Sequence, residues 1–308
     1  MLATVETYGA LNQALSKRFQ GGVEESLQKP GIFKPLYKVI PSTSKSEVYQ
    51  HLNGCPTFRE WVSGTERVYR NIEETDFAVT NKKYEATISV DLDRVDDNQI
   101  GSYGTMAESL GMAASRLQEK LIGQLIAGAF ASTKTADGQY WISDTHAMGQ
   151  SNFDNLTTGT LSFTTFATAY QQIRSFTFKA DKDSYAEPVN TNADLYLIVP
   201  QALELTARDI VALETRNEAT YSTKNPYYNL AKVIVNGYAT STTAWMLMAV
   251  TNFPPIYYQE RQKPVLEEKT PVNSDTAFNR DCWIWGAKAR GAALPTFPWQ
   301  VVGSLGTT

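Results

Sequence analysis

Cys282-Trp283-Ile284-Trp285-Gly286-Ala287-Lys288-Ala289-Arg290-Gly291 is the stretch that decides the fold of this chain. Trp283 and Trp285 lie two residues apart, so they share one face of a strand, where such aromatic residues fill a core or an interface more often than they stack bases. Two further fragments accompany the stretch, Tyr258-Gln259-Glu260-Arg261-Gln262-Lys263-Pro264 before it and Trp299-Gln300 after it. We expect residues 256–302 to supply closing strands that return to pack on the long helix predicted earlier in the chain.

Three earlier blocks join these fragments in a fixed order: Phe19-Gln20-Gly21-Gly22, then Pro56-Thr57-Phe58-Arg59-Glu60-Trp61-Val62, then Asn81-Lys82-Lys83-Tyr84-Glu85 running to Asp96-Asp97. With these blocks the chain resembles the major head subunit of Mu-type tailed bacteriophages over nearly its whole length. Each short block is weak by itself, and the ordered set carries the signal. Where proteins of this type tend to have His-Pro, this chain has His146-Ala147.

The resemblance implies an α+β fold, the tailed-phage major capsid fold that herpesvirus shell proteins share. It also implies four regions. These are an N-terminal arm (1–64), an extended hairpin loop (65–96), a peripheral domain with a long spine helix (97–150 and 253–308) and a compact axial α+β domain (151–252).

Composition narrows the function classes. The chain has 308 residues and 42% hydrophobic residues, enough for a real core, but no run approaches the roughly 18 apolar residues of a membrane span. A net charge of -4 argues against a dedicated nucleic-acid binder, whereas a container for DNA needs no basic patch. The N-terminus does not read as a secretory signal. Cys55 and Cys282 show no spacing for a metal site or a disulfide framework.

The first 64 residues read as a helix followed by an arm. Apolar positions from Leu2 to Phe19 have an approximate helical period, and we expect a short helix that ends at Gly21-Gly22. The stretch from Val23 to Ser63 holds four prolines and few apolar runs, which favours an extended segment lying over a neighbour.

The residues from Thr65 to Leu92 read as a long two-stranded hairpin. In the second strand Ala86, Ile88, Val90 and Leu92 alternate with polar residues, and the first strand, residues 66–72, is strongly charged. An isolated hairpin is marginally stable in water, so we expect its cover on an adjacent subunit.

The longest helical pattern follows and predicts the spine helix. Its apolar face is predicted to hold Met106, Leu110, Ala113, Leu117, Leu121, Leu125 and Ala129. Thr105 and Glu108 offer a capping-box start, and Gly111, Gly123 and Gly128 would allow close packing.

The region after residue 150 predicts alternating helices and strands. Helices are expected at 162–176 and 202–213, and strands at 194–199, 233–235 and 244–250. This mixture predicts a compact α+β unit.

Catalytic chemistry has few candidates. The chain has two histidines, His51 and His146, and no GxSxG nucleophile elbow, so ordinary surface roles are the expectation for both. Arg290 could contact a phosphate, although an ion pair is the commoner outcome. We predict no catalytic residue, no cofactor and no bound metal.

The acidic cluster Asp91, Asp93, Asp96 and Asp97 could hold a hard cation, but a solvated strand edge is the more ordinary reading. These acids could also pair across a subunit boundary with Arg67, Arg70, Lys82 or Lys83. Lys82 and Lys83 also raise the possibility of a lysine-to-asparagine isopeptide weld between subunits, against the ordinary reading of a solvated basic turn.

The resemblance therefore implies a major capsid protein that assembles into hexamers and pentamers and forms an icosahedral head around double-stranded DNA. The expected partners are further copies of itself, a scaffolding protein and a portal during assembly, and packaged DNA bound without sequence specificity. No membrane partner is expected. The expected location is the virion, with the host cytoplasm during assembly. The alternatives are a cellular nanocompartment shell of the same fold and a cytoplasmic hydrolase using residues 91–97.

Overall fold

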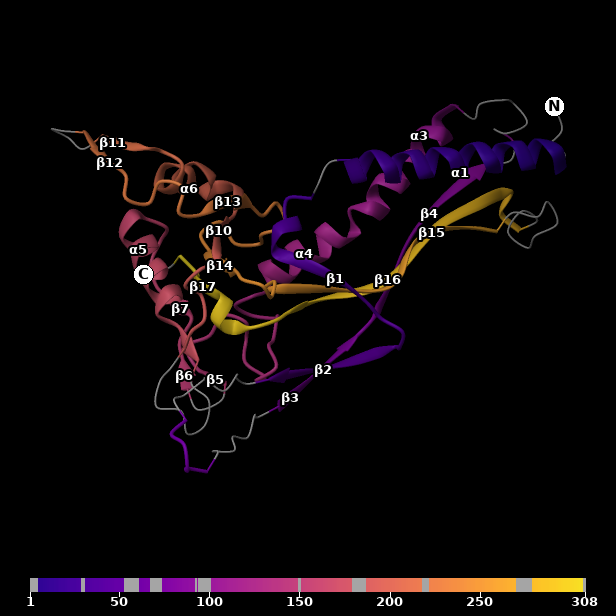
Figure 1. Cartoon of the computed structure of the whole chain (residues 1–308). Helices are drawn as coiled ribbons and strands as arrows, with labels where there is room; N and C mark the ends of the chain where they lie inside the picture. Colours follow the sequence, from indigo (N-terminus) through magenta and orange to yellow (C-terminus); the bar gives the residue numbers. More distant parts are fainter. Residues whose placement is uncertain are drawn as a thin grey trace.

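The chain has a three-cornered outline built around two separate sheets (Figure 1). This computed structural model describes residues 5–28, 31–52, 61–66, 74–91, 93, 101–148, 151–178, 187–217, 222–269 and 279–306. Arg67, Arg70, Asp96, Asp97 and Cys55, all named in the sequence predictions, lie outside these residues.

A long four-stranded sheet has the order β1-β15-β16-β4. Its strands are β1 (Tyr37–Pro41), β15 (Ile256–Lys269), β16 (Cys282–Pro295) and β4 (Lys82–Asp91). β1 runs parallel to β15, and the other neighbours are antiparallel. Trp283 and Trp285 are fully buried on one face with their rings edge to face, as the period-two spacing predicts.

Three helices lie against that face: α1 (Val5–Gln28), α3 (Gly101–Ser115) and α4 (Leu117–Ala127). The prediction that the first helix ends at Gly21-Gly22 is wrong, because α1 continues to Gln28. A side chain at Gly22 would collide with the backbone of Glu108, and one at Gly111 with the backbone of Phe19. These glycines let α1 and α3 cross closely, so tertiary packing outweighs the weak helix propensity of glycine.

The predicted spine helix is present but interrupted. α3 begins at Gly101, so Thr105 lies inside the helix and the predicted capping box is wrong. The regular helix stops at Ser115 and resumes at Leu117. Its buried face agrees only in part with the predicted one, because Leu110 and Ala129 are buried as predicted, whereas α1 covers Tyr103 and Ala107 and leaves Met106 exposed.

The second sheet has five strands in the order β13-β10-β14-β17-β7. Its strands are β13 (Lys232–Val235), β10 (Asp194–Val199), β14 (Trp245–Val250), β17 (Val301–Ser304) and β7 (Leu156–Thr157). α5 (Phe163–Ser175) and α6 (Glu204–Val211) pack with these strands in one core cluster.

The predicted elements of this unit are confirmed, and Ser162 caps α5 through a reciprocal capping box with Thr165. One strand was not expected here. β17 pairs with β14, so it joins this sheet, and its Val301 lies in one core cluster with Ile122 and Ile126 of α4.

The extended hairpin has different strands from those predicted. β2 (Ser46–Leu52) pairs with β3 (Glu74–Thr80), whereas β4 pairs with β16. The prediction that residues 86–91 belong to the hairpin is therefore wrong, because their apolar face lies on α3 and β16, and Leu92 lies outside the described residues. The segment from Val23 to Ser63 is likewise no continuous arm, since it contains the end of α1, β1 and β2. The region boundaries at 64, 96, 150 and 252 stay a prediction.

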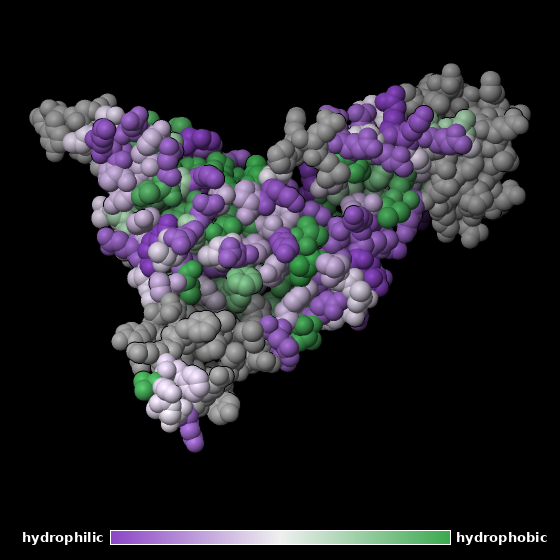
Figure 2. Space-filling model, in the orientation of Figure 1, coloured by the Kyte–Doolittle hydropathy of each residue, from purple (hydrophilic) through white to green (hydrophobic). Residues whose placement is uncertain are grey.

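The remaining elements are short. They are the pairs β5 (His146–Met148) with β6 (Ser151–Phe153), β8 (Thr177–Phe178) with β9 (Glu187–Pro188) and β11 (Thr215–Asn217) with β12 (Ser222–Lys224), and the 3-10 turns η1 (Lys34–Leu36), η2 (Gln201–Leu203) and η3 (Pro298–Gln300). Among the helices described, none has the length and apolar character that crossing a bilayer requires. Figure 2 shows apolar side chains exposed in separate patches between hydrophilic ones.

Candidate assembly surfaces

The base of the β2–β3 hairpin is held by a tight polar turn. One carboxylate oxygen of Glu47 accepts hydrogen bonds from the amides of Thr43 (2.8 Å) and Ser44 (2.9 Å) and from the Ser42 hydroxyl (2.9 Å). The bonds from the Ser44 and Thr43 amides lower the pKa of Glu47. Asn81 Nδ2 donates to the Ser42 hydroxyl (2.8 Å) and the Ser44 carbonyl (2.9 Å). These bonds fix the direction in which the hairpin leaves the body.

The hairpin also touches the body along its base. Tyr49 donates its hydroxyl hydrogen to Gln259 Oε1 at 2.6 Å. Val79 lies in a small apolar cluster with Ala292 and Leu294 of β16. The base of the hairpin is thus anchored on its own chain.

Residues 61–66 form a turn that displays two large apolar side chains. Trp61 is 54% exposed and Val62 is 62% exposed. The Trp61 indole donates to the Thr65 carbonyl at 2.9 Å, and Gly64 has a φ of 91°, a conformation that favours glycine. A turn held in this way presents an apolar surface of the kind that binds another protein.

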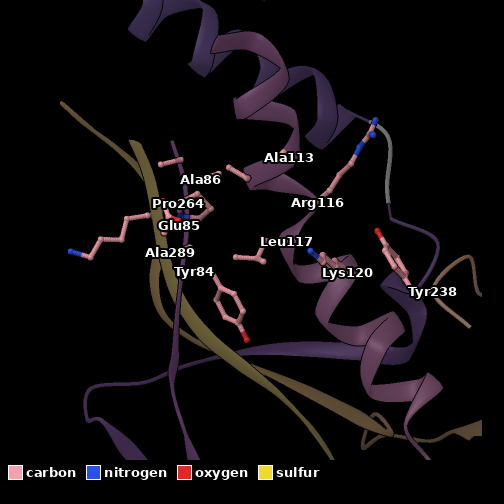
Figure 3. A pocket seen from close by; sticks show the side chains of 13 residues that line it. Tyr84, Glu85, Ala86, Ala113, Arg116, Leu117, Lys120, Tyr238, Pro264 and Ala289 are labelled. Atoms are coloured by element: carbon pink, nitrogen blue, oxygen red, sulfur yellow. The ribbon is translucent and has the colours of Figure 1, made fainter. Parts of the chain in front are cut away.

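A groove runs between the spine helix and β4. Its deeper part has a volume of about 380 Å³ and lies between α3, α4 and the strands β4 and β16. In Figure 3, Leu117 points from the helix toward the strands and Arg116 points away from them. The shallower part is lined by Ile88, Met106, Ser109 and Leu110. Met106 and Leu117 of the predicted apolar face therefore line an open groove.

The N-terminal connection is held to α4 by Glu119. This carboxylate accepts a hydrogen bond from the Phe33 amide at 3.3 Å, while its other oxygen is buried and has no hydrogen-bond partner among the residues that the structure describes. Burial raises the pKa of Glu119, against backbone hydrogen bonds from Phe33 and Ile32 and the charge of Lys34. The ionised side chain is therefore poorly solvated at this point.

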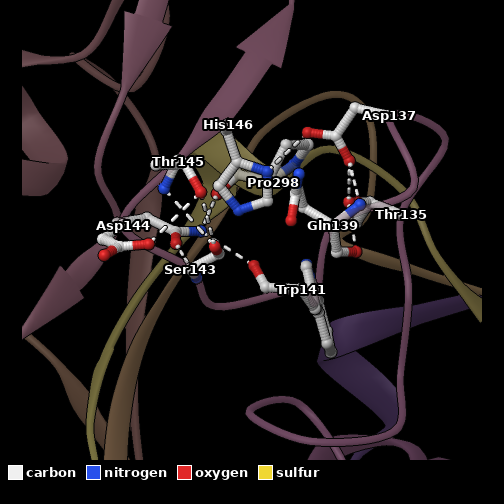
Figure 4. A network of polar contacts seen from close by, with 10 residues as sticks. Thr135, Asp137, Gln139, Trp141, Ser143, Asp144, Thr145, His146 and Pro298 are labelled. Atoms are coloured by element: carbon white, nitrogen blue, oxygen red, sulfur yellow. Dashed lines mark hydrogen bonds and ion pairs between the residues drawn. The ribbon is translucent and has the colours of Figure 1, made fainter.

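His146 is fully buried, so the expectation of a surface role for it is wrong. Its Nδ1 lies 2.6 Å from Asp137 Oδ2 (Figure 4), and its ring stacks on Phe153 with centroids 5.1 Å apart. The Thr135 hydroxyl donates to Asp137 at 2.6 Å. Burial would by itself raise the pKa of Asp137, but the hydrogen bonds from His146 and Thr135 outweigh it and hold this pKa below its ordinary value.

Asn155 completes this junction between the two sheets. Its buried side chain donates to the carbonyls of Trp141 and Pro298, both at 2.8 Å, and accepts from the Ser143 amide at 2.8 Å. Within the described residues His146 Nε2 has no hydrogen-bond partner, and the Ser143 hydroxyl bonds within its own loop. In that part of the chain the bonds therefore hold the connecting loops together, and none of them aligns a nucleophile with the histidine.

Part of the predicted acidic cluster is brought together. Asp91 and Asp93 lie beside Asp281, with their carboxylate oxygens within 4.8 Å of one another, and all three residues are exposed. Asp281 has a φ of 47°. Asp281 was not among the predicted site residues. Its position just before β16, which pairs with β4, is the signal that could have found it.

The other predicted site residues have structural surroundings. Lys82 and Lys83 are exposed on β4. Among the residues that the structure describes, none forms an ion pair with Arg290, whose Nε is buried without a hydrogen-bond partner, so the expected ion pair is not formed within that part of the chain. His51 pairs with Thr75 across the hairpin backbone.

Known structures have the same fold. A chain of the procapsid of bacteriophage JBD30 matches with a TM-score of 0.57 at 20% identity, covering 98% of this chain and 76% of that one. A chain of the mature capsid of bacteriophage PhiM1 matches with a TM-score of 0.55 at 11% identity, covering 90% of this chain and 87% of that one. The fold is thus the α+β fold of tailed-phage major capsid proteins.

Sequence comparison points the same way. The major capsid protein of Escherichia phage Mu is 28% identical over 301 residues, 98% of this chain and 74% of that protein. The Mu-like prophage FluMu major head subunit of Haemophilus influenzae is 28% identical over 147 residues, 47% of this chain and 46% of that protein. The family model of the Mu-like prophage major head subunit gpT matches residues 9–164 and 236–306. This match covers well over half of the chain, which therefore belongs to the family of Mu-like major head subunits.

Proposed function

We propose that this protein is a major capsid subunit that assembles with copies of itself into hexamers and pentamers of a closed icosahedral head around double-stranded DNA. The observation that carries the proposal, beside the family, is the anchored β2–β3 hairpin with its exposed turn. Trp61 and Val62 present apolar area that the described part of their own chain leaves accessible. Each contact is small, but repetition around a ring gives a large total stability.

The role of the chain in this proposal is mechanical. A net charge of -4 suits a wall that encloses DNA without gripping it. Assembly would involve a scaffolding protein and a portal, in the host cytoplasm, before the subunit becomes part of the virion.

The hairpin turn supplies the direct test. Replacing Trp61 and Val62 together with serine should leave the subunit folded, with an unchanged denaturation midpoint, because both side chains are largely exposed. Negative-stain images and sedimentation should then show no stable shells. Val62→Ile, which keeps the apolar surface and the bond from Trp61 to Thr65, is the matched control and should retain assembly. Normal particles from the double serine variant would refute a role for this turn in clasping a neighbour.

The contents and size of the product separate the alternatives. If the protein forms a phage head, the particles should contain packaged DNA. If it forms a nanocompartment shell, the particles should contain a protein cargo. A hydrolase using residues 91–97 predicts a small discrete species whose melting point rises with a ligand. Concentration-dependent, megadalton-scale assembly is the result expected here.

A further inference from the structure

The four-stranded sheet has two unlike edges. β1 is five residues long and ends in Pro41, which has no amide to donate. β4 is ten residues long, has no bulge in its register with β16 and contains no proline. Among the strands that the structure describes, none pairs with the outer edge of β4. A long regular edge of this kind is a template for another strand.

The faces of β4 are sharply divided. Tyr84, Ile88 and Val90 turn toward the helices and are half-buried or buried, whereas Lys83, Glu85, Thr87, Ser89 and Asp91 are exposed on the other face. The open groove beside α3 lies along the helix-facing side of this edge. A strand added here would continue the sheet and also cover the apolar groove.

We propose that the occupant is the β4 strand of a second copy of this chain, paired antiparallel about a two-fold axis through Thr87, so that two four-stranded sheets become one continuous sheet. The proposal deepens the proposed function, on which it rests, because it names one contact between copies within the shell. It is an isologous contact, in which the same residues serve on both sides.

The sequence of β4 is complementary to itself in this register. Opposite residues of an antiparallel pair must point to the same face. Centring the pair on Thr87 sets Lys83 opposite Asp91 of the partner copy on the polar face, twice by symmetry. On the helix-facing side it sets Tyr84 opposite Val90, and Ala86 opposite Ile88.

Neighbouring registers lack this match. If one strand shifts by two residues in one direction, Asp91 lies opposite Glu85 of the partner copy, and the two carboxylates repel each other. If it shifts by two residues in the other direction, Asp91 lies opposite Asn81 of the partner copy. Exposed ion pairs are individually weak, so we infer that these pairs select the register and contribute little to the affinity. The backbone hydrogen bonds of the added strand and the covered groove, including Met106 of both copies, supply the affinity.

Cysteine cross-linking tests the register directly. In a full-length chain with Cys55→Ser and Cys282→Ser, Thr87→Cys places two thiols opposite each other, within the Cα separation of about 4.4–6.8 Å that a disulfide requires. Mild oxidation of assembled particles should yield covalent dimers. Ser89→Cys is the matched control and should not cross-link to itself, because its partner is residue 85. Mixed Glu85→Cys and Ser89→Cys chains should form dimers only in the mixture.

Charge exchange gives a second test that does not depend on cysteines. Lys83→Asp alone and Asp91→Lys alone should each weaken the dimer contact several-fold, and the double exchange should restore it. Intact particles without Thr87→Cys dimers, or with Ser89→Cys dimers instead, would overturn the strand pairing while the capsid function stands. A parent chain that forms no large species at any concentration would contradict the proposed function itself.

Discussion

The two sheets of this protein differ in how far their own chain completes them. In the five-stranded sheet β10, β14 and β17 are buried almost throughout, and the edge strands β13 and β7 have only four and two residues. In the four-stranded sheet one face is covered by helices, the other carries exposed polar residues, and the edge strand β4 has ten residues. We infer that the first sheet supplies the stability of the subunit and the second supplies its contacts.

The largest expected effect is in the five-stranded sheet. Leu247→Ala removes a fully buried side chain from the middle of β14 and should lower the free energy of unfolding by about 2–5 kcal/mol. Urea denaturation of the free subunit measures this loss. Val265→Ala, at a residue of β15 that is 46% exposed, is the control and should change the free energy little. An equal loss of unfolding free energy at both positions would contradict the inference that the five-stranded sheet supplies the stability of the subunit.

The junction between the sheets should be the next most sensitive place. His146→Ala leaves the Asp137 carboxylate buried without its main partner and should cost about 3 kcal/mol of unfolding free energy. Chemical denaturation near neutral pH measures the cost. A loss within the experimental error would show that the pair does not brace the junction.

The pH dependence of the same pair has a definite sign. Because the folded pKa of Asp137 is below its ordinary value of about 3.9, its contribution is present above that value and is lost as the pH falls through the folded pKa. The stability difference between the parent and Asp137→Asn should therefore narrow toward low pH. Asp144→Asn, in the same loop but exposed, is the matched control and should change the stability little at neutral pH.

The crossing of α1 over α3 should give an intermediate effect. Gly111→Ala forces the backbone of Phe19 away and should cost about 1–3 kcal/mol. Gly9→Ala is a matched control on α1, because nothing lies within 4 Å of an added Cβ there, and it should stabilise the helix by about 0.5–1 kcal/mol. Thermal denaturation of both variants compares them, and a tolerated Gly111→Ala would mean that α1 does not rest on α3 in solution.

The smallest expected effect is at Glu119. Burial raises its folded pKa, so the ionised carboxylate opposes folding, and the parent loses stability as the pH rises through that pKa. Glu119→Gln should therefore be at least as stable as the parent at neutral pH, with an advantage below about 1 kcal/mol that disappears in acid. Denaturation midpoints at several pH values test this, and a lower midpoint for Glu119→Gln at neutral pH would contradict it.

Local patterns in the sequence predicted the compact unit well. Continuous apolar runs such as residues 195–199 and 245–250 are short, which favours buried strands, and Ser162 marks the start of α5. The alternation around Trp283 likewise predicted its buried face. Each of these signals lies within a few residues of the element that it describes.

Long-range pairing could not be predicted in the same way. The alternation of β4 shows that it is a strand, but the choice of β16 over a hairpin partner depends on residues some 200 positions away. The resemblance predicted an extended hairpin, yet its strands proved to be β2 and β3. Burial of His146 was missed because its partner Asp137 reaches it only through the fold of the connecting loop.

Hydrogen exchange measured by mass spectrometry, compared between the free subunit and assembled particles, tests the central contrast most directly. We expect peptides from β4 and from the β2–β3 hairpin to gain protection from exchange on assembly. Peptides from β10 and β14 should already be protected in the free subunit and should stay unchanged. A uniform gain over both sheets, or protection of β4 that is complete before assembly, would contradict this expectation.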